Sequence, residues 1–453
     1  MHLGDFEKGL ETSKEVNVTN HLEAEVYNCV VRGQVPKGLD GTFYRYLPDF
    51  PWSRIDHDDV FINGNGCIDA VRFQNGHVDF KQRYVRMAKF VIERAARQAV
   101  LGKYGNRYME DPRVKHMIHS TAHSNIVYYQ NQLLATKMDS LPYVVDPDTM
   151  ETKGVYDYNG QYKAPTHTAR PKIDPRNGEL ITMGYETKGD SSPDIAYYLF
   201  DRNAKKLEEC WVKGPYASMI LDVAATDKWI VFVLNPLAAV PVEMMHTVHH
   251  HFACDPQKPA VFGVLPRRGP KPEDVKWFHF ENTFIGHTGN AFDGEEGCIY
   301  MDTSVKYEKL FWSSSPEQRS NLPLMPPDPS KHKKGSYVRW RLDPNANDLF
   351  VKPIELIDLE GDTPKIDERF QMQPYKSLFF NTHVGAHKEG PKGASWNAIA
   401  RCDVETGKYD IWNAGPDTAL HGVAFSPRGS DGEPHVYSSI HESPLTLYST
   451  RSP

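Results

Sequence analysis

The sequence lacks the features that mark nucleic-acid-binding, secreted and membrane-spanning proteins. Its 52 basic residues are outnumbered by 59 acidic ones, so no positive excess favours a nucleic-acid partner. Its six cysteines include no CxxC pair, which predicts reduced thiols and a cytoplasmic location. The first residues hold no apolar core of a signal peptide, and no run of about 18 apolar residues follows. We therefore expect no transmembrane segment, and composition leaves the oligomeric state open.

Helical patterns are also scarce, because only Met87–Leu101 combines a helical period with helix-forming residues. Most of the remaining sequence consists of short strand-like runs between turn residues. The clearest is Ala70–Phe73, Asn75-Gly76 and His77–Phe80, where Asn-Gly favours the positive φ angles of a type I′ hairpin turn. These patterns predict an all-β protein with one inserted helix.

A loose repeat favours one all-β architecture over the others. Five segments share an apolar strand, an aspartate, a turn and a return strand, and antiparallel hairpins recurring in this way are typical of β-propeller blades. Ordinary hairpins in another all-β fold remain the alternative. We expect a single domain spanning residues 1–453. The five aspartates are Asp146, Asp174, Asp201, Asp343 and Asp403.

Residues 164–186 end in a turn and a strand that the local sequence predicts, and they begin with a segment that holds an unexpected arginine. Asp174–Gly178 consists of residues that favour a turn, and Glu179–Tyr185 of residues that favour a strand. Before them, Thr166–Lys172 places Arg170 directly ahead of a proline. Six further motifs occur in order along the chain: FINGNG from Phe61, KYGNRYMEDP from Lys103, LLATKMDSLPYVVDPDTMETKG from Leu133, HHHFACDPQKPAVFGVLPRRG from His249, HTGNAF from His287 and DTPKIDERF from Asp362.

Together these motifs resemble the carotenoid cleavage oxygenase family, within it the stilbene-cleaving branch of resveratrol and lignostilbene oxygenases. The resemblance extends from about Gly41 to Ile440. It implies a seven-bladed β-propeller, with loops and a helix capping an axial substrate tunnel. In active members it also implies an iron ion held by four histidines, which three glutamates brace.

The resemblance places three of the four ligand positions at Arg170, Leu221 and His287, and only the last is a histidine. The segment expected to carry the fourth is not found before Pro453. A guanidinium has no free lone pair and a leucine has no donor atom, so neither can bind a metal ion. We therefore predict that the protein uses no metal and no other cofactor.

Two of the bracing positions have changed as well, since the resemblance places them at Met138 and Asp362 rather than at glutamates. His167 lies three residues before Arg170 and could replace it as a ligand only if a bulge turned it to the same strand face. The alternative to a metal-free protein is thus an Fe²⁺ site with rearranged ligands, for which His167 and His287 are the candidates.

One substrate-binding feature of the branch is kept. In the stilbene-cleaving relatives a tyrosine and a lysine bind the 4-hydroxyl group of the substrate, and these positions resemble Tyr104 and Lys137 here. A partly desolvated lysine beside a tyrosine hydroxyl can favour a phenolate. The alternative is that both residues are structural. We predict a small-molecule aromatic or polyene substrate.

These observations lead to three hypotheses about function. The preferred one is a metal-independent lyase, isomerase or cyclase. It would act on a phenolic, tropolone-like or polyene natural product by dehydration, isomerisation or cyclisation, including quinone-methide formation and pericyclic, Diels–Alder-type ring closure. The alternatives are an Fe²⁺-dependent oxygenase that cleaves stilbene or carotenoid double bonds, and a non-catalytic binder of hydrophobic aromatics. The predicted catalytic residues are Arg170, His287, Lys137 and Tyr104, and the predicted substrate contacts are Tyr104, Lys137, His167, Leu221, Met138 and Asp362.

Overall fold

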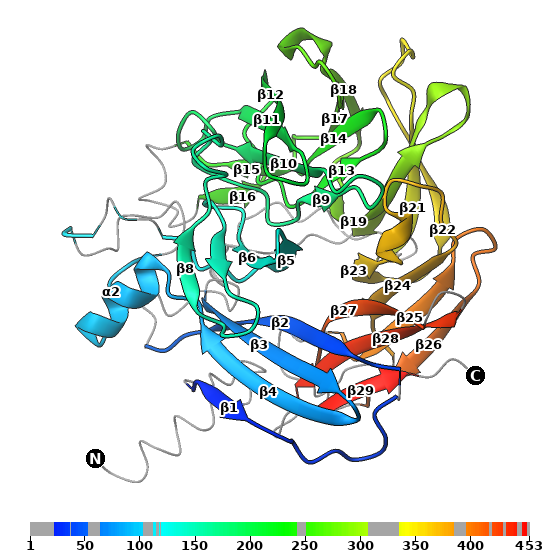
Figure 1. Cartoon of the computed structure of the whole chain (residues 1–453). Helices are drawn as coiled ribbons and strands as arrows, with labels where there is room; N and C mark the ends of the chain where they lie inside the picture. Colours follow the sequence, from blue (N-terminus) through cyan, green and yellow to red (C-terminus); the bar gives the residue numbers. More distant parts are fainter. Residues whose placement is uncertain are drawn as a thin grey trace, which may run out of the picture.

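The computed structural model describes residues 22–36, 38–52, 64–102, 112–114, 117, 119–241, 251–306, 335–384, 396–415, 419–428, 432–441 and 446–450. Its strands form antiparallel sheets arranged in a ring, as the blades of a propeller are (Figure 1). One α-helix and short 3-10 turns are the only helices in this part of the chain. The prediction of an all-β propeller is confirmed.

The first three sheets each pair four strands, with the spatial order given by their labels. The sheet β1-β4-β3-β2 contains β1 (Ala24–Val26), β4 (His77–Tyr84), β3 (Asn65–Gln74) and β2 (Gly41–Asp49). The sheet β5-β6-β7-β8 contains β5 (Asn125–Tyr129), β6 (Gln132–Thr136), β7 (Tyr143–Val145) and β8 (Thr152–Val155). The sheet β12-β11-β10-β9 contains β12 (Lys206–Lys213), β11 (Asp194–Phe200), β10 (Leu180–Tyr185) and β9 (Lys172–Ile173).

Three further sheets also have four strands each. The sheet β13-β14-β17-β18 contains β13 (Val223–Ala225), β14 (Trp229–Leu234), β17 (Ala260–Pro266) and β18 (Lys276–Phe280). The sheet β19-β20-β21-β22 contains β19 (Phe284–Asp293), β20 (Ile299–Lys306), β21 (Gly335–Leu342) and β22 (Pro353–Ile357). The sheet β23-β24-β25-β26 contains β23 (Gly361–Lys365), β24 (Ser377–Thr382), β25 (Ala398–Asp403) and β26 (Tyr409–Asn413).

Two smaller sheets remain. A two-stranded ribbon pairs β15 (Leu237–Ala239) with β16 (Phe252–Cys254), and a three-stranded sheet contains β27 (Ala419–Arg428), β28 (Gly432–His441) and β29 (Thr446–Thr450). The described residues therefore form six four-stranded blades rather than the seven that we predicted. The difference arises because the last sheet has no fourth strand among the described residues.

Aspartates explain why the hairpin repeat could be read from the sequence. Asp146 and Asp201 directly follow a strand and Asp403 ends one, and all three accept hydrogen bonds from backbone N–H groups two to four residues later. Such side-chain-to-backbone bonds stabilise a turn locally. The predicted hairpin is also confirmed, because Asn75 and Gly76 both have positive φ angles, of 51° and 81°, between β3 and β4.

The predicted helix is present but shorter than expected. Helix α2 covers Ala88–Ala96 and ends at Arg97, which adopts the left-handed conformation with φ at 56°. The chain then turns back, so that the backbone N–H groups of Val100 and Leu101 donate to the Glu93 carboxylate at 3.1 and 3.2 Å. At the end of the helix the backbone carbonyl oxygen of Glu93 accepts from the N–H groups of Arg97 and Gln98.

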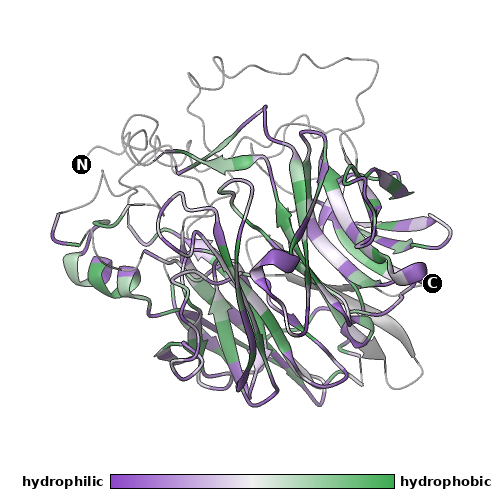
Figure 2. Cartoon of the chain, turned by 90° about the horizontal axis from the view of Figure 1, so that it is seen from above, coloured by the Kyte–Doolittle hydropathy of each residue, from purple (hydrophilic) through white to green (hydrophobic). Residues whose placement is uncertain are grey.

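The core lies between and within the blades, where large apolar and aromatic side chains are fully buried. In Figure 2 the hydrophobic colour gathers on the strands and the hydrophilic colour on many of the turns. All six cysteines are free, so no disulfide contributes to stability. Among the described residues, no helix is long and apolar enough to span a membrane.

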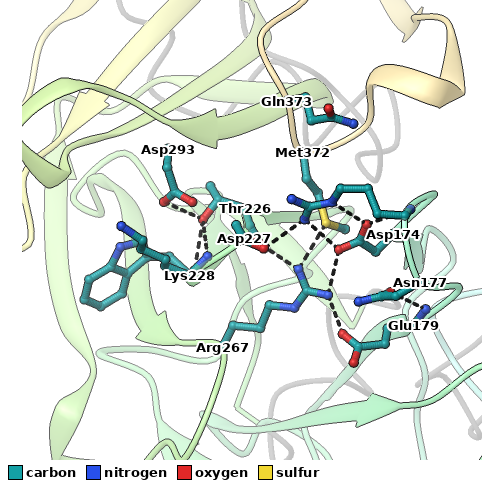
Figure 3. Close-up of polar contacts among 12 residues, drawn as sticks. Asp174, Asn177, Glu179, Thr226, Asp227, Lys228, Arg267, Asp293, Met372 and Gln373 are labelled. Carbon is teal, nitrogen blue, oxygen red and sulfur yellow. Dashed lines mark hydrogen bonds and ion pairs between the residues drawn. The ribbon is translucent and has the colours of Figure 1, made fainter.

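A dense ion-pair network joins the turn before β10 to the end of β17. Figure 3 shows Arg267 pointing towards Asp174 and Glu179. Its guanidinium donates to these two carboxylates at 3.0 and 2.6 Å and to the carbonyl oxygen of Thr226 at 3.0 Å. Arg267 is 1% exposed, so its charge is compensated by protein groups rather than by water.

Candidate functional site

The candidate site is built on the first strands of four successive sheets, β9, β13, β19 and β23, each of which packs against the next. Arg170 lies two residues before β9, and Leu221 lies two residues before β13. His287 lies on β19, and Asp362 lies on β23. The ring thus brings four of the predicted site positions onto neighbouring strands.

His287 is oriented by Asp362. Its ring Nδ1 lies 3.0 Å from Asp362 Oδ1, and its backbone N–H donates to the same oxygen at 3.1 Å. Asp362 also accepts hydrogen bonds from Ser304 Oγ at 2.7 Å and from the Thr363 N–H at 2.8 Å. Burial alone would raise the pKa of Asp362, but His287 and Lys306 together with these donors hold it well below its usual range.

An ionised Asp362 fixes the tautomer of His287. The carboxylate accepts the proton on Nδ1, so in the neutral ring Nε2 carries the free lone pair. The close approach depends on Gly286, because a Cβ there would clash with Ser304 Oγ and lie 3.0 Å from Asp362 Oδ1. The imidazole is 21% exposed, so Nε2 can act on a ligand as a base or as a donor atom.

Arg170 is half-buried and carries an uncompensated charge. Its backbone N–H donates to Thr168 Oγ1 at 3.2 Å, but in the described part of the chain its guanidinium has neither a hydrogen-bond acceptor nor a carboxylate partner. Leu221 is 7% exposed and belongs to an apolar cluster with Met138, Ala169 and Phe284. Leu221 therefore supplies a nonpolar wall where a ligand atom was expected.

Lys137 and Asp139 form a second, buried polar group. Lys137 Nζ lies 3.0 Å from Asp139 Oδ2, and both side chains are more than 90% buried. Asp139 Oδ1 and the hydroxyl of Tyr185 have no hydrogen-bond partner among the described residues. Burial, with Glu186 and Asp139, holds the pKa of Tyr185 well above its usual range, so this hydroxyl is neutral. Unpaired buried polar atoms of this kind suit a polar substituent of a ligand.

An apolar cluster connects the two polar groups. Met138 follows Lys137 directly, and it shares one buried cluster with Tyr185, Leu221 and Phe284. The cluster adjoins the Lys137–Asp139 pair through Met138 and Arg170 through Ala169, whose carbonyl oxygen accepts a hydrogen bond from Thr136 Oγ1 at 2.8 Å. An aromatic molecule with a polar substituent fits this combination of apolar and polar surfaces.

Two other predicted residues do not join this arrangement in the structure. His167 is fully buried, with Nε2 2.9 Å from Tyr158 Oη and 2.8 Å from Thr182 Oγ1, and with Nδ1 2.7 Å from the Thr168 carbonyl oxygen. Burial lowers the pKa of His167 to about 4, so the ring is neutral. Both nitrogens are thus occupied by protein groups. Tyr104 lies outside the described residues.

Sequence reasoning missed the residues that complete the site. Asp139, Ser304 and Lys365 are the main ones, and they contact or electrostatically influence Lys137, Asp362 and Arg170. Asp139 follows Lys137 by two residues in the turn after β6, so this partner could have been found from its nearness in the sequence. No local signal links Ser304 or Lys365 to the site, because the ring brings them there.

The protein is a β-propeller that carries charged side chains on or beside the first strands of neighbouring blades. Comparisons with known proteins identify its family. The family model described as retinal pigment epithelial membrane protein matches residues 16–443, so the chain belongs to the carotenoid cleavage oxygenase family. A resveratrol cleavage oxygenase from Aspergillus fumigatus is 38% identical over 90% of this chain and 82% of its own length.

Two solved structures are similar to the chain over nearly its whole length. Lignostilbene dioxygenase from Pseudomonas brassicacearum superimposes with a TM-score of 0.86 and 31% identity, covering 94% of this chain and 89% of its own. Cobalt-substituted apocarotenoid oxygenase from Synechocystis superimposes with a TM-score of 0.76 over 95% of this chain and 91% of its own. The latter is 21% identical and supports the fold alone.

These comparisons correct three of our predictions. The relatives are oxygenases that act on stilbenes, which overturns the metal-independent lyase, isomerase or cyclase and supports the alternative of double-bond cleavage. The enzyme class is corrected in the same way. The prediction that no cofactor is used is also wrong for this family, whose members are oxygenases and include a metal-substituted protein.

The residues described here nevertheless do not fit the family's metal ion. No group of three or more histidine, cysteine, aspartate or glutamate side chains in the described ranges could hold one. Of the three ligand positions that the resemblance places in the described residues, a guanidinium and a leucine occupy two, and only His287 carries a donor atom. We therefore derive no chemical step through a metal.

Proposed function

We propose that the protein binds a phenolic stilbene-type alkene along the propeller axis and acts on its double bond as an oxygenase. The observation that carries this proposal is the buried Lys137–Asp139 pair beside an apolar cluster that also adjoins Arg170. The similarity to oxygenases named for resveratrol and lignostilbene supports the same substrate class.

In this proposal the two polar groups have different roles. Lys137 binds the phenolic hydroxyl of the substrate, with Tyr104 as its predicted partner, and Asp139 accepts a hydrogen bond from that hydroxyl. The side chains of Met138 and Leu221 contact the hydrocarbon part. His287, whose tautomer Asp362 fixes, faces the alkene with a free Nε2.

The same proposal includes the finer features of the architecture. The three-stranded sheet β27–β29 lies between the sheets of β23–β26 and β1–β4 in Figure 1, and we take it as an incomplete seventh blade. We further propose a single domain over residues 1–453, with loops and a helix capping the axis. Six free cysteines favour a reducing compartment such as the cytosol.

The test uses trans-resveratrol as the substrate and the full-length protein with and without added Fe²⁺. The proposal predicts oxygen uptake and formation of two aromatic aldehydes, and the comparison with and without Fe²⁺ measures whether residues beyond the described donor His287 supply a metal site. Lys137→Met should lower kcat/KM by about 10- to 100-fold because the phenol loses a charge-assisted hydrogen bond. Lys153→Met is the matched control, since Lys153 pairs with Glu151 on the surface.

The donor set favours a second candidate, a protein that binds aromatic phenols without cleaving them. One histidine cannot replace the four-histidine site that the resemblance implies. This candidate predicts that trans-resveratrol binds, that Lys137→Met weakens the binding, and that no oxygen is consumed at any Fe²⁺ concentration. Oxygen uptake that tracks bound metal rejects it.

A further inference from the structure

The carboxylate of Asp362 uses only one of its two oxygens for hydrogen bonds. His287 donates to Asp362 Oδ1 from both its ring and its backbone, and Ser304 Oγ and the Thr363 N–H donate to the same oxygen. Among the described residues, none donates a hydrogen bond to Oδ2. Because each carboxylate oxygen accepts hydrogen bonds, Asp362 still offers an acceptor beside His287.

Lys306, the last residue of β20, lies close to this second oxygen without a hydrogen bond to it. Its Nζ is 4.0 Å from Asp362 Oδ2, which allows electrostatic attraction but is too long for a hydrogen bond. The same ammonium lies 4.9 Å from the centre of the Trp396 ring, a cation–π contact that orients the lysine. In the described part of the chain Lys306 donates no hydrogen bond, so its N–H groups can bind a ligand atom.

A third polar group beside Asp362 also lacks a partner. Asn381 on β24 is paired directly with Asp362 on β23, and residues opposite each other in an antiparallel pair have Cβ atoms about 5 Å apart. The Asn381 side chain is buried, yet neither its amide oxygen nor its amide nitrogen has a hydrogen-bond partner among the described residues. Buried amides are normally paired, so three neighbouring polar groups remain able to bond to a ligand.

The charges of the Asp362–Lys306 pair decide which chemical group fits between them. The carboxylate would repel an anion and the ammonium would repel a cation, whereas a neutral hydroxyl group donates to Asp362 Oδ2 and accepts from Lys306 Nζ. An oxygen about 2.8 Å from each of two atoms that lie 4.0 Å apart sees them at an angle of about 90°, which a hydroxyl group can accommodate.

The pair is also within reach of a molecule from solution. The side chains of His287, Lys306 and Asp362 are 21%, 17% and 11% exposed. A group bound by Lys306 and Asp362 would therefore lie next to the imidazole of His287, because Asp362 contacts both residues.

We infer that Lys306 and Asp362 bind a hydroxyl group on the substrate ring that Lys137 does not hold, and that they select stilbenes hydroxylated on both rings. The inference rests on the proposed function for its substrate class. It assigns to Lys306 a role in specificity, since this ammonium supplies a hydrogen bond only to a substrate whose second ring carries a hydroxyl group.

The test measures binding of three stilbenes to the full-length protein by isothermal titration calorimetry. trans-Resveratrol has hydroxyl groups on both rings, trans-4-hydroxystilbene lacks those of the second ring, and trans-3,5-dihydroxystilbene lacks the one that Lys137 is proposed to bind. Wild-type protein should bind trans-resveratrol at least about tenfold more tightly than trans-4-hydroxystilbene. Lys306→Met should reduce this preference to less than about twofold, because the ammonium that donates to the second ring is gone.

Two controls protect the interpretation. Lys376→Met removes an exposed lysine that pairs with Asp403 and Glu405, and it should leave the preference unchanged. Lys306→Arg keeps a cation with N–H donors and should retain a preference, which separates loss of the donor from loss of the fold.

The third stilbene separates this inference from the proposed function. Lys137→Met should abolish the preference for trans-resveratrol over trans-3,5-dihydroxystilbene and should keep the preference that Lys306 provides. If Lys137→Met has no such effect, the proposed role of Lys137 fails while the result for Lys306 still stands.

Equal binding of trans-resveratrol and trans-4-hydroxystilbene to the wild type would overturn the inference and leave water as the hydroxyl group that the pair binds. An unchanged preference in a folded Lys306→Met variant would overturn it as well. Binding of none of the three stilbenes would reject both the inference and the proposed substrate class. Because the readout is binding, a loss of oxygenase turnover does not affect these results.

Discussion

Arg267 and Arg170 are the same residue type in two opposite settings. Arg267 is buried between the turns of two neighbouring blades and donates to two carboxylates and one carbonyl group. Arg170 is half-buried at the ring's centre, and no protein group in the described residues compensates its charge. The comparison teaches that a charge whose partners are all protein groups supports the fold, whereas a charge left without partners is available to a ligand.

The largest effect should follow from breaking the compensated network. Arg267→Met removes the buried partner that Asp174 and Glu179 share and leaves them only the more exposed Arg176 and Arg268. Removing one partner of a buried ion pair costs about 3–5 kcal/mol. We expect the free energy of unfolding in urea to fall by that amount. Arg268→Met is the matched control, because Arg268 also pairs with Glu179 but is 49% exposed, and its loss should cost about 1 kcal/mol or less. Equal losses in the two variants would contradict this description of the network.

Acid should weaken the same network by a smaller amount. Burial would raise the pKa of Asp174, but hydrogen bonds from Arg176 and Arg267 outweigh it and lower the pKa to about 2. The stabilisation is therefore present above the unfolded pKa of about 4 and is lost as the pH falls towards 2.

Urea unfolding at pH 5, 4, 3 and 2 should show roughly 2 kcal/mol of this loss. Asp174→Asn removes the titrating group, so its stability should depend less on pH in that interval. A variant with the wild-type pH dependence would show that other carboxylates carry the effect.

The sequence predicted the local parts of this molecule well and the long-range parts poorly. The turns at Asp146 and Asn75-Gly76 could be read because their hydrogen bonds and φ angles involve residues only a few positions apart. The seven blades that the resemblance implies differ from the six four-stranded blades of the described residues, because the last sheet has only three described strands. The helix was overextended because Glu93 captures the chain at Val100, a contact that helix propensity does not encode.

The candidate site shows the same difference between local features, which could be predicted, and long-range contacts, which could not. His287 and Lys137 were identified through motifs that survive in the sequence, and the structure gives each an acidic partner. The influence of Arg170 on Lys365 could not be predicted, since the two residues are distant in the chain and meet only when the ring forms. His167 illustrates the reverse case, because its hydrogen bonds to Tyr158 and Thr182 are invisible in the sequence.

A third change tests the central site without disturbing the network around Arg267. Asp362→Asn replaces the carboxylate that fixes the His287 tautomer by an amide, so turnover of trans-resveratrol should fall by about tenfold. Nitrogen-15 NMR of the histidine ring should show a mixture of tautomers instead of one. Ser304→Ala, which removes only one donor to Asp362, should retain the single tautomer, and a single tautomer in Asp362→Asn would reject the assigned role.

The smallest expected change is the most direct test of the central claim, that the charges at the ring's centre are held for a ligand rather than for the fold. Arg170→Met removes a half-buried cation that has no protein partner to leave behind. We predict that its free energy of unfolding in urea stays within about 1 kcal/mol of the wild type or rises, because an uncompensated charge has been removed. A loss of about 3 kcal/mol or more, as expected for Arg267→Met, would contradict the account and make Arg170 a structural residue.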